Sequence, residues 1–213
     1  MQIRLRKVSP DFIEEEKIIG SGIWNADLLF QPAEKVQIIA PSGSGKTSLI
    51  HFLYGLRKDY AGHIFYDDKD IAGFGAEDFA TYRREHVSIV FQDMRLFSEH
   101  SVLQNLEIKR QLNPFHSGSK IFSMAGRLGI ESKLGKNCQT CSYGEQQRIA
   151  IIRALQQPFD FLLLDEPFSH LDDHNRLLAM ELIQEEVSLR KATVILADLK
   201  ALDFFNADRY INL

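Results

Sequence analysis

The stretch Ala40-Pro41-Ser42-Gly43-Ser44-Gly45-Lys46-Thr47 decides the fold of this chain. It follows an apolar run at residues 36–39 and precedes a helical pattern that includes Leu49. A strand, a turn of small residues and a helix are the setting of a phosphate-binding loop. Gly43 and Gly45 permit a tight turn whose N–H groups point into one concavity, and the helix start adds unpaired donors. The flanks disfavour a plain Gly/Ser turn, so we predict that the loop binds a nucleoside triphosphate.

Each polar residue of this loop has an expected role. Lys46 reaches the β- and γ-phosphates, and the Thr47 hydroxyl binds Mg²⁺. Ala40 stands where the motif has its first glycine, and its methyl group is compatible with the loop if φ is negative there. The residues expected to bind the nucleotide are Ser42, Gly43, Ser44, Gly45, Lys46, Thr47 and Ser48.

Composition narrows the class of protein. The chain has 213 residues, 45% hydrophobic and 25% charged, which suits one large soluble domain or two small lobes. A net charge of −4 gives no general attraction to nucleic acid. No apolar run approaches the roughly 18 residues of a membrane span. Cys138 and Cys141 have C-x-x-C spacing, but zinc would need further ligands, so we expect free thiols in a reducing cytosol.

Strand patterns alternate with helical ones, which predicts an α/β core. Residues 93–157 are mostly helical in pattern, and a helix is expected over residues 173–190. The expected strands lie at residues 2–7, 26–30, 36–40, 62–68, 87–91, 161–164 and 193–197.

A second set of candidate residues follows the apolar run at 161–164. Asp165 and Glu166 stand at the carboxyl end of this expected strand, where open α/β sheets place their ligands. Asp165 is suited to holding Mg²⁺. Glu166 is suited to accepting a proton from an attacking water.

The segment Cys141-Ser142-Tyr143-Gly144-Glu145-Gln146-Gln147-Arg148 begins another expected helix. Ser142 and Glu145 have the spacing of a capping box, so a purely structural role is one interpretation. The same geometry makes this helix start a second anion-binding end. A single phosphate loop has no evident use for it, whereas two chains facing each other would each close over the nucleotide of the other.

With these motifs in place, the chain resembles an ATP-binding cassette (ABC) transporter subunit over essentially its whole length. Residues 90–93 resemble the Q-loop of that family, residues 142–146 its signature and residues 169–172 its D-loop. Phe12 falls where the family stacks an aromatic ring on adenine. The pattern around residues 87–108 is most similar to small exporter or extraction subunits, such as those of lipoprotein release and macrolide export.

The resemblance implies a P-loop NTPase cassette with a mixed central sheet, an antiparallel β subdomain and a helical subdomain. Residues 1–213 are expected to form a single domain, with the core and β lobe at 1–92 and 158–213 and the helical lobe at 93–157. The implied catalytic residues are Glu166, Gln92 and Lys46. The implied metal ligands are Thr47, Gln92 and Asp165, and the residues contacting a neighbour's nucleotide are Ser142, Gly144 and Glu145.

The resemblance also implies cofactors and partners. ATP and Mg²⁺ are the expected cofactors, and ATP hydrolysis is the expected activity. Two cassettes, identical or different, are expected to pair head to tail and to drive a membrane permease from the cytoplasmic, inner face of the membrane, without nucleic acid. Met94, Leu96 and Phe97 are expected either to line the permease-docking groove or to pack inside the helical lobe.

Two further departures from the family pattern affect the expected rate. Tyr143 replaces the first signature glycine, which would strain the backbone if φ were positive there. The family's switch histidine is absent, because no histidine follows His174 and Asp198 stands in that segment. Losing one preorganised donor lowers a rate by about 10²–10³-fold. We therefore expect slow hydrolysis, with a binding-only regulatory cassette as the alternative.

Two other classes that share this cassette fit less well. Chromosome and repair ATPases insert long coiled coils, and this sequence has no sustained heptad run. Translation-factor cassettes occur as two in one chain, and this chain has one.

Overall fold

The computed structural model describes residues 1–14 and 18–213. No helix in this part of the chain combines the length and apolar character needed to cross a membrane. The α-helices are α2 (Lys46–Leu53), α3 (Ala76–Glu85), α4 (Val102–Leu112), α5 (Gly118–Arg127), α6 (Tyr143–Ala154) and α7 (Asp173–Arg190). The strands are β1 (Ile3–Pro10), β2 (Asp27–Phe30), β3 (Lys35–Ile39), β4 (Tyr60–Tyr66), β5 (Lys69–Asp70), β6 (Val87–Val90), β7 (Phe161–Asp165), β8 (Thr193–Asp198) and β9 (Arg209–Asn212). Short 3₁₀ turns are η1 (Ile71–Gly73), η2 (Glu131–Lys133) and η3 (Cys138–Thr140).

The described strands form two separate sheets. One sheet has the order β2-β1-β4-β5 and antiparallel pairing, and the other has the order β6-β7-β8-β3-β9 and parallel pairing. The predicted α/β fold with an antiparallel β subdomain and a helical subdomain is confirmed. Antiparallel pairing occurs in one sheet and parallel pairing in the other, so the described strands of the central sheet all run parallel to their neighbours. Crossover connections, and not hairpins, join the strands of the central sheet, and such connections give parallel pairing.

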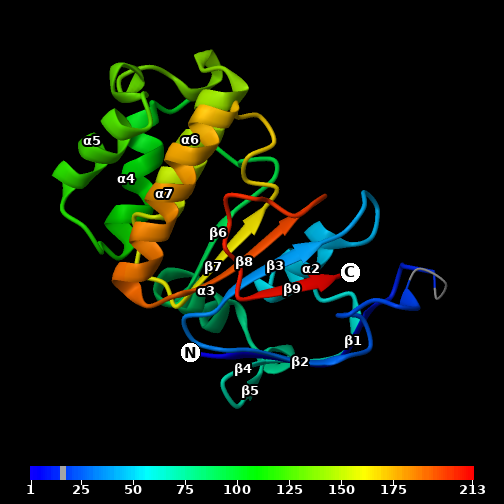
Figure 1. Ribbon diagram of the computed structural model, residues 1–213. Coiled ribbons are helices and arrows are strands. Elements are labelled where there is room, and N and C mark those ends of the chain that lie inside the picture. Colours follow the sequence, from blue (N-terminus) through cyan, green and yellow to red (C-terminus); the bar gives the residue numbers. More distant parts are fainter. Residues whose placement is uncertain (15–17) are drawn as a thin grey trace.

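Alternation along β7 explains how the parallel sheet is covered. Phe161 and Leu163 belong to a core cluster with α2 and the antiparallel sheet, whereas Leu162 and Leu164 belong to a cluster with α4, α5, α6 and α7. All four side chains are fully buried. Figure 1 shows α4–α7 gathered at one side of the molecule and the antiparallel sheet at the other, with the parallel sheet between them.

The carboxyl ends of three parallel strands meet at one edge of the central sheet. Ile39, the last residue of β3, pairs with Asp198 of β8, and Ala197 pairs with Asp165 of β7. The backbone N–H of Ala40 donates to the carbonyl of Asp198 at 3.1 Å. The phosphate loop predicted at residues 40–47 therefore begins beside the strand ends that carry the acidic residues.

Candidate nucleotide-binding site

The turn between β3 and α2 depends on its glycines. Gly43 has φ of 80° and Gly45 has φ of 100°, which side-chain-bearing residues rarely adopt. A Cβ atom on Gly45 would also lie 2.8 Å from Ile13 Cδ1 and 3.0 Å from the ring of Trp24. Ala40 is buried at a negative φ, so the methyl group that replaces the first motif glycine fits the loop.

Lys46 points back into this turn. Its side chain is 5% exposed, and its ammonium donates to the carbonyls of Ala40 at 2.9 Å and Pro41 at 3.1 Å. The same ammonium lies 3.5 Å from Glu166 Oε1. The structure thus brings together two of the three predicted catalytic residues. Lys46 follows β3 and Glu166 follows β7 at the same edge of the central sheet.

The third predicted catalytic residue, Gln92, contacts the start of α2. The Thr47 hydroxyl donates to Gln92 Oε1 at 3.3 Å. A cavity of about 250 Å³ is lined by Thr47, Gln92 and Asp165 together with His51, Asp93 and Arg95. The three predicted metal ligands therefore border one space.

The burial of the Asp165 carboxylate is separate evidence for a divalent cation at this position. The Asp165 side chain is 1% exposed, and neither carboxylate oxygen meets the distance and angle of a hydrogen bond with any described residue. The Thr47 hydroxyl is near enough to favour the charged carboxylate, but it donates to Gln92 Oε1. Burial raises the pKa of Asp165 to about 6. Buried carboxylates are normally paired or bound to a metal, so these two oxygens fit Mg²⁺.

We expect Asp165→Asn to stabilise the nucleotide-free chain at pH 7.5 and to weaken its Mg²⁺-dependent stabilisation by ATP. Because the pKa rises from 3.8 to about 6 in the fold, the contribution of Asp165 to stability falls as pH rises between these values and stays low above them. The shift corresponds to on the order of 2–3 kcal/mol. Urea unfolding of both proteins at pH 4.5 and 7.5 measures the difference. A difference of equal size at both pH values would contradict this account.

A larger cavity of about 410 Å³ lies over the phosphate loop. It is lined by Phe12, Ile13, Glu14, Ser42, Gly43, Gly45, Lys46, Thr47, Ser48, Gln92 and Glu166. Ser44 is not among these residues, since its hydroxyl donates to the carbonyl of Pro41 and its own carbonyl accepts from the Trp24 indole. The Ser44 N–H also donates to the Pro41 carbonyl, at 3.4 Å, so Ser44 shapes the loop and does not line the cavity.

Phe12 has a partner that the sequence did not reveal. Its ring is 50% exposed, and the guanidinium of Arg57 lies 4.4 Å from the ring centre. Arg57 is held by both carboxylate oxygens of Asp59 and donates to the Ser48 hydroxyl at 3.2 Å. A cation on one face of the ring is favourable, and it supports Phe12 at the rim of the cavity.

We expect Phe12→Ala to weaken ATP binding by about 5–150-fold, because stacking of a base on an aromatic ring contributes about 1–3 kcal/mol. Phe122→Ala is the matched control, since Phe122 is 47% exposed on α5. Equilibrium titration with a fluorescent ATP analogue measures both variants. If the two variants bound ATP with equal affinity, Phe12 would not be a nucleotide-binding residue.

The capping box at the start of α6 is confirmed. The Glu145 N–H donates to the Ser142 hydroxyl at 3.3 Å, and the Ser142 N–H donates to the Glu145 carboxylate at 2.8 Å. Lys133 binds the same carboxylate at 2.9 Å and, with this N–H, holds the pKa of Glu145 below its usual range. Neither Ser142, Gly144 nor Glu145 lines the cavity at the phosphate loop of its own chain.

Tyr143 and Asp198 take positions that the sequence left open. Tyr143 is the first helical residue of α6 at a negative φ, so it is unstrained, and its side chain is 69% exposed beside the ring of His170. Asp198 accepts from the Leu199 N–H at 2.7 Å. Burial raises the pKa of Asp198. The carboxylate thus folds back on its own backbone.

The two cysteines are free, buried and next to the start of α6. The Asn105 amide lies 3.2 Å from Cys138 Sγ, and burial raises the pKa of the Cys138 thiol to about 11. Such thiols are poor nucleophiles at neutral pH.

A glycine turn between a parallel strand and a helix, with two carboxylates at the adjacent strand end, defines a P-loop nucleotide-binding protein. The family model for the ABC transporter matches residues 23–169. This chain therefore belongs to the ABC transporter family, and the predicted resemblance to an ABC-type ATP-binding cassette is confirmed.

Individual relatives agree with this family. The chain is 34% identical over 186 residues to a macrolide export ATP-binding/permease protein, MacB, of Nitrosomonas europaea, covering 86% of this chain and 28% of the relative. It is 33% identical over 149 residues to a lipoprotein-releasing system ATP-binding protein, LolD, of Idiomarina loihiensis, covering 68% of this chain and 65% of the relative. The chain thus spans less than two thirds of either protein.

A solved structure supports the fold. The ATP-binding cassette MJ0796, a dimer in a post-hydrolysis state bound to ADP and Pi, superposes with a TM-score of 0.85 at 23% identity, covering 99% of this chain and 94% of that one.

Proposed function

We propose that this chain is the ATP-binding subunit of an ABC transporter. In this proposal it couples Mg-ATP binding, head-to-tail pairing of two cassettes and slow ATP hydrolysis to a membrane permease. The observation that carries the proposal is the sheet edge beside the 410 Å³ cavity, where Lys46 and Glu166 lie 3.5 Å apart and the buried Asp165 carboxylate accepts no hydrogen bond from residues 1–14 or 18–213.

In this proposal, different residues of the cavity bind the phosphates, the base and the metal ion. Lys46 exchanges the carbonyls of Ala40 and Pro41 for phosphate oxygens, which are stronger acceptors because they are charged. Phe12 stacks on the base from the cavity rim. Thr47, Gln92 and Asp165 hold Mg²⁺, which neutralises charge on the β- and γ-phosphates.

Glu166 is the general base in this proposal. Its carboxylate lines the cavity and accepts a proton from water, while Lys46 keeps a positive charge beside it. Hydrolysis is slow because Asp198 stands where the family has a histidine and its carboxylate binds its own backbone. The same observation favours the second candidate, a regulatory cassette that binds ATP without turning it over.

The position of Ser142 supports pairing of two cassettes. The capped start of α6 presents free N–H donors, yet its residues do not line the cavity of their own chain. A second cassette, identical or different, would place its nucleotide against this helix end. The MJ0796 cassette was solved as a dimer.

The names of the relatives support a permease as the partner. One is an ATP-binding/permease protein and another is the ATP-binding protein of a lipoprotein-releasing system. We place this chain at the inner face of the cell membrane, with no nucleic acid among its partners in view of its net charge of −4. Of the residues considered for docking, Met94 is buried in the core of α4–α7, Leu96 is half-buried against it and Phe97 is 50% exposed.

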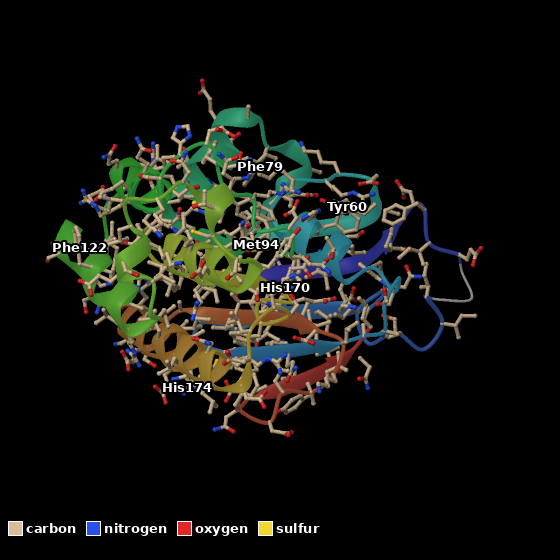
Figure 2. All side chains as sticks on the ribbon, turned by 90° about the horizontal axis from the view of Figure 1, so that it is seen from above. Tyr60, Phe79, Met94, Phe122, His170 and His174 are labelled. Carbon is tan, nitrogen blue, oxygen red and sulfur yellow. The ribbon has the colours of Figure 1, made fainter. Side chains whose placement is uncertain are left out.

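Affinity purification from detergent-solubilised membranes of the native cells tests this function. We expect the tagged chain to retain a membrane protein, and Phe97→Asp to lose it. Phe122→Asp is the matched control, because Phe122 is similarly exposed but projects from the outer edge of α5, far from Met94 in Figure 2. Recovery of soluble partners or nucleic acid alone would overturn the transport assignment.

A further inference from the structure

Glu166 has a backbone conformation that its own residue type does not favour. Its φ is 45°, in the left-handed region, which is unfavourable for a residue other than glycine. Its N–H donates to the carbonyl of Ala197 at 2.9 Å, which holds one side of the peptide. Such a conformation persists only where the surroundings hold it, and the direction of the carboxylate depends on it.

Gln147, in the second turn of α6, binds the backbone carbonyl of Glu166. Its side chain is 1% exposed, and its amide nitrogen donates to the carbonyl of Glu166 at 3.3 Å and to the Ser169 hydroxyl at 3.2 Å. Its amide oxygen accepts from the N–H of His170 at 2.8 Å. One buried amide therefore uses all of its groups on residues 166–170, and each lost partner would leave a buried polar group unsatisfied.

The start of α6 packs closely on the same segment. A Cβ on Gly144 would lie 3.0 Å from the carbonyl oxygen of His170, and the Tyr143 ring lies 5.4 Å from the His170 ring. His170 itself is exposed, and Figure 2 shows it near the middle of the view from above. The segment that carries Glu166 is thus fastened to the helix that begins at Ser142.

We propose that Gln147 is a positioning residue, which fixes the backbone of residues 166–170 so that the Glu166 carboxylate points into the nucleotide cavity. This rests on the proposed role of Glu166 as general base. Gln147 also couples the position of Glu166 to the start of α6 at Ser142, because a shift of α6 moves Gln147 and with it the Glu166 peptide.

Steady-state ATP hydrolysis by Gln147→Met and Gln157→Met tests the proposal. Methionine keeps the length of the side chain and removes its hydrogen bonds. Gln157 is the matched control, because it is also 1% exposed and donates to the backbone carbonyls of Arg83 at 2.7 Å and Val87 at 3.4 Å, away from the cavity. We expect kcat to fall at least tenfold in Gln147→Met with KM for ATP within twofold, since small misplacements of a reacting group are costly. Both constants stay within twofold in Gln157→Met.

Hydrogen–deuterium exchange gives a readout that needs no turnover. The His170 N–H is bound by Gln147, so exchange in residues 166–171 accelerates at least tenfold in Gln147→Met and is unchanged in Gln157→Met. Gln147→Glu, which keeps the acceptor but not the donors, serves as a second variant and also lowers kcat.

Two results would overturn the role of Gln147: equal loss of kcat in the Gln147 and Gln157 variants, or unchanged exchange in residues 166–171. If the wild-type chain showed no Glu166-dependent hydrolysis, the proposed function would fail instead. The exchange experiment would still report whether Gln147 holds the segment.

Discussion

Glu166→Gln is expected to lower the rate of ATP hydrolysis by about 10²–10⁴-fold while changing the affinity for ATP only a few-fold. The amide keeps the size of the side chain but cannot accept a proton at neutral pH, and general-base catalysis contributes a factor of this order. Glu166 lies 3.5 Å from Lys46 at the wall of the cavity, so its charge also acts on the phosphate site. Phosphate release under single-turnover conditions, alongside equilibrium ATP titration, measures both effects.

Glu181→Gln is the control for this substitution. Glu181 lies on α7, 62% exposed, and meets Arg127 at the surface. It is expected to leave the rate unchanged. If the wild-type chain bound ATP but released no more phosphate than Glu166→Gln, the binding-only regulator would replace the slow enzyme.

Lys46→Met is expected to weaken ATP binding by about 10–150-fold and to abolish measurable hydrolysis. Charge-assisted hydrogen bonds of the kind that Lys46 would make to phosphate contribute about 1.5–3 kcal/mol. The fold is expected to survive, because in the nucleotide-free state the ammonium donates to two carbonyls at its own loop and otherwise pairs with Glu166 at the cavity wall, outside the hydrophobic core. Isothermal titration calorimetry with ATP in Mg²⁺ gives the affinity, and a phosphate-release assay gives the rate.

Lys58→Met controls for the loss of a positive charge near the site. Its ammonium donates to the carbonyl of Phe74 on an exposed surface, outside the cavity. Affinity for ATP is expected to stay within twofold of the wild type. Should both lysine variants bind ATP as the wild type does, the cavity over residues 40–47 would not be the nucleotide site.

Features encoded by neighbouring residues could be predicted from the sequence. The glycine turn at residues 43–45, the capping box of Ser142 and Glu145, and the helix at residues 173–190 each follow from short patterns. The two carboxylates at the end of β7 could be placed as well, because parallel strands end at one edge of a sheet.

Features that depend on contacts between distant segments could not be predicted. Arg57 lies against Phe12 because the turn after α2 returns to the end of β1. Gln147 stands between two other polar residues in the first half of α6, so nothing in the sequence marks it as buried, and only the fold shows that residues 166–170 satisfy its amide. No short pattern encodes such contacts.

A crystal structure of this chain with Mg²⁺ and a non-hydrolysable ATP analogue would show directly whether the cavity over residues 42–48 is the nucleotide site. We expect the triphosphate in this cavity, with the Lys46 ammonium moved from the carbonyls of Ala40 and Pro41 to the phosphates and Asp165 facing the metal. An analogue bound elsewhere, or Lys46 still on its own loop with the cavity filled, would contradict this expectation.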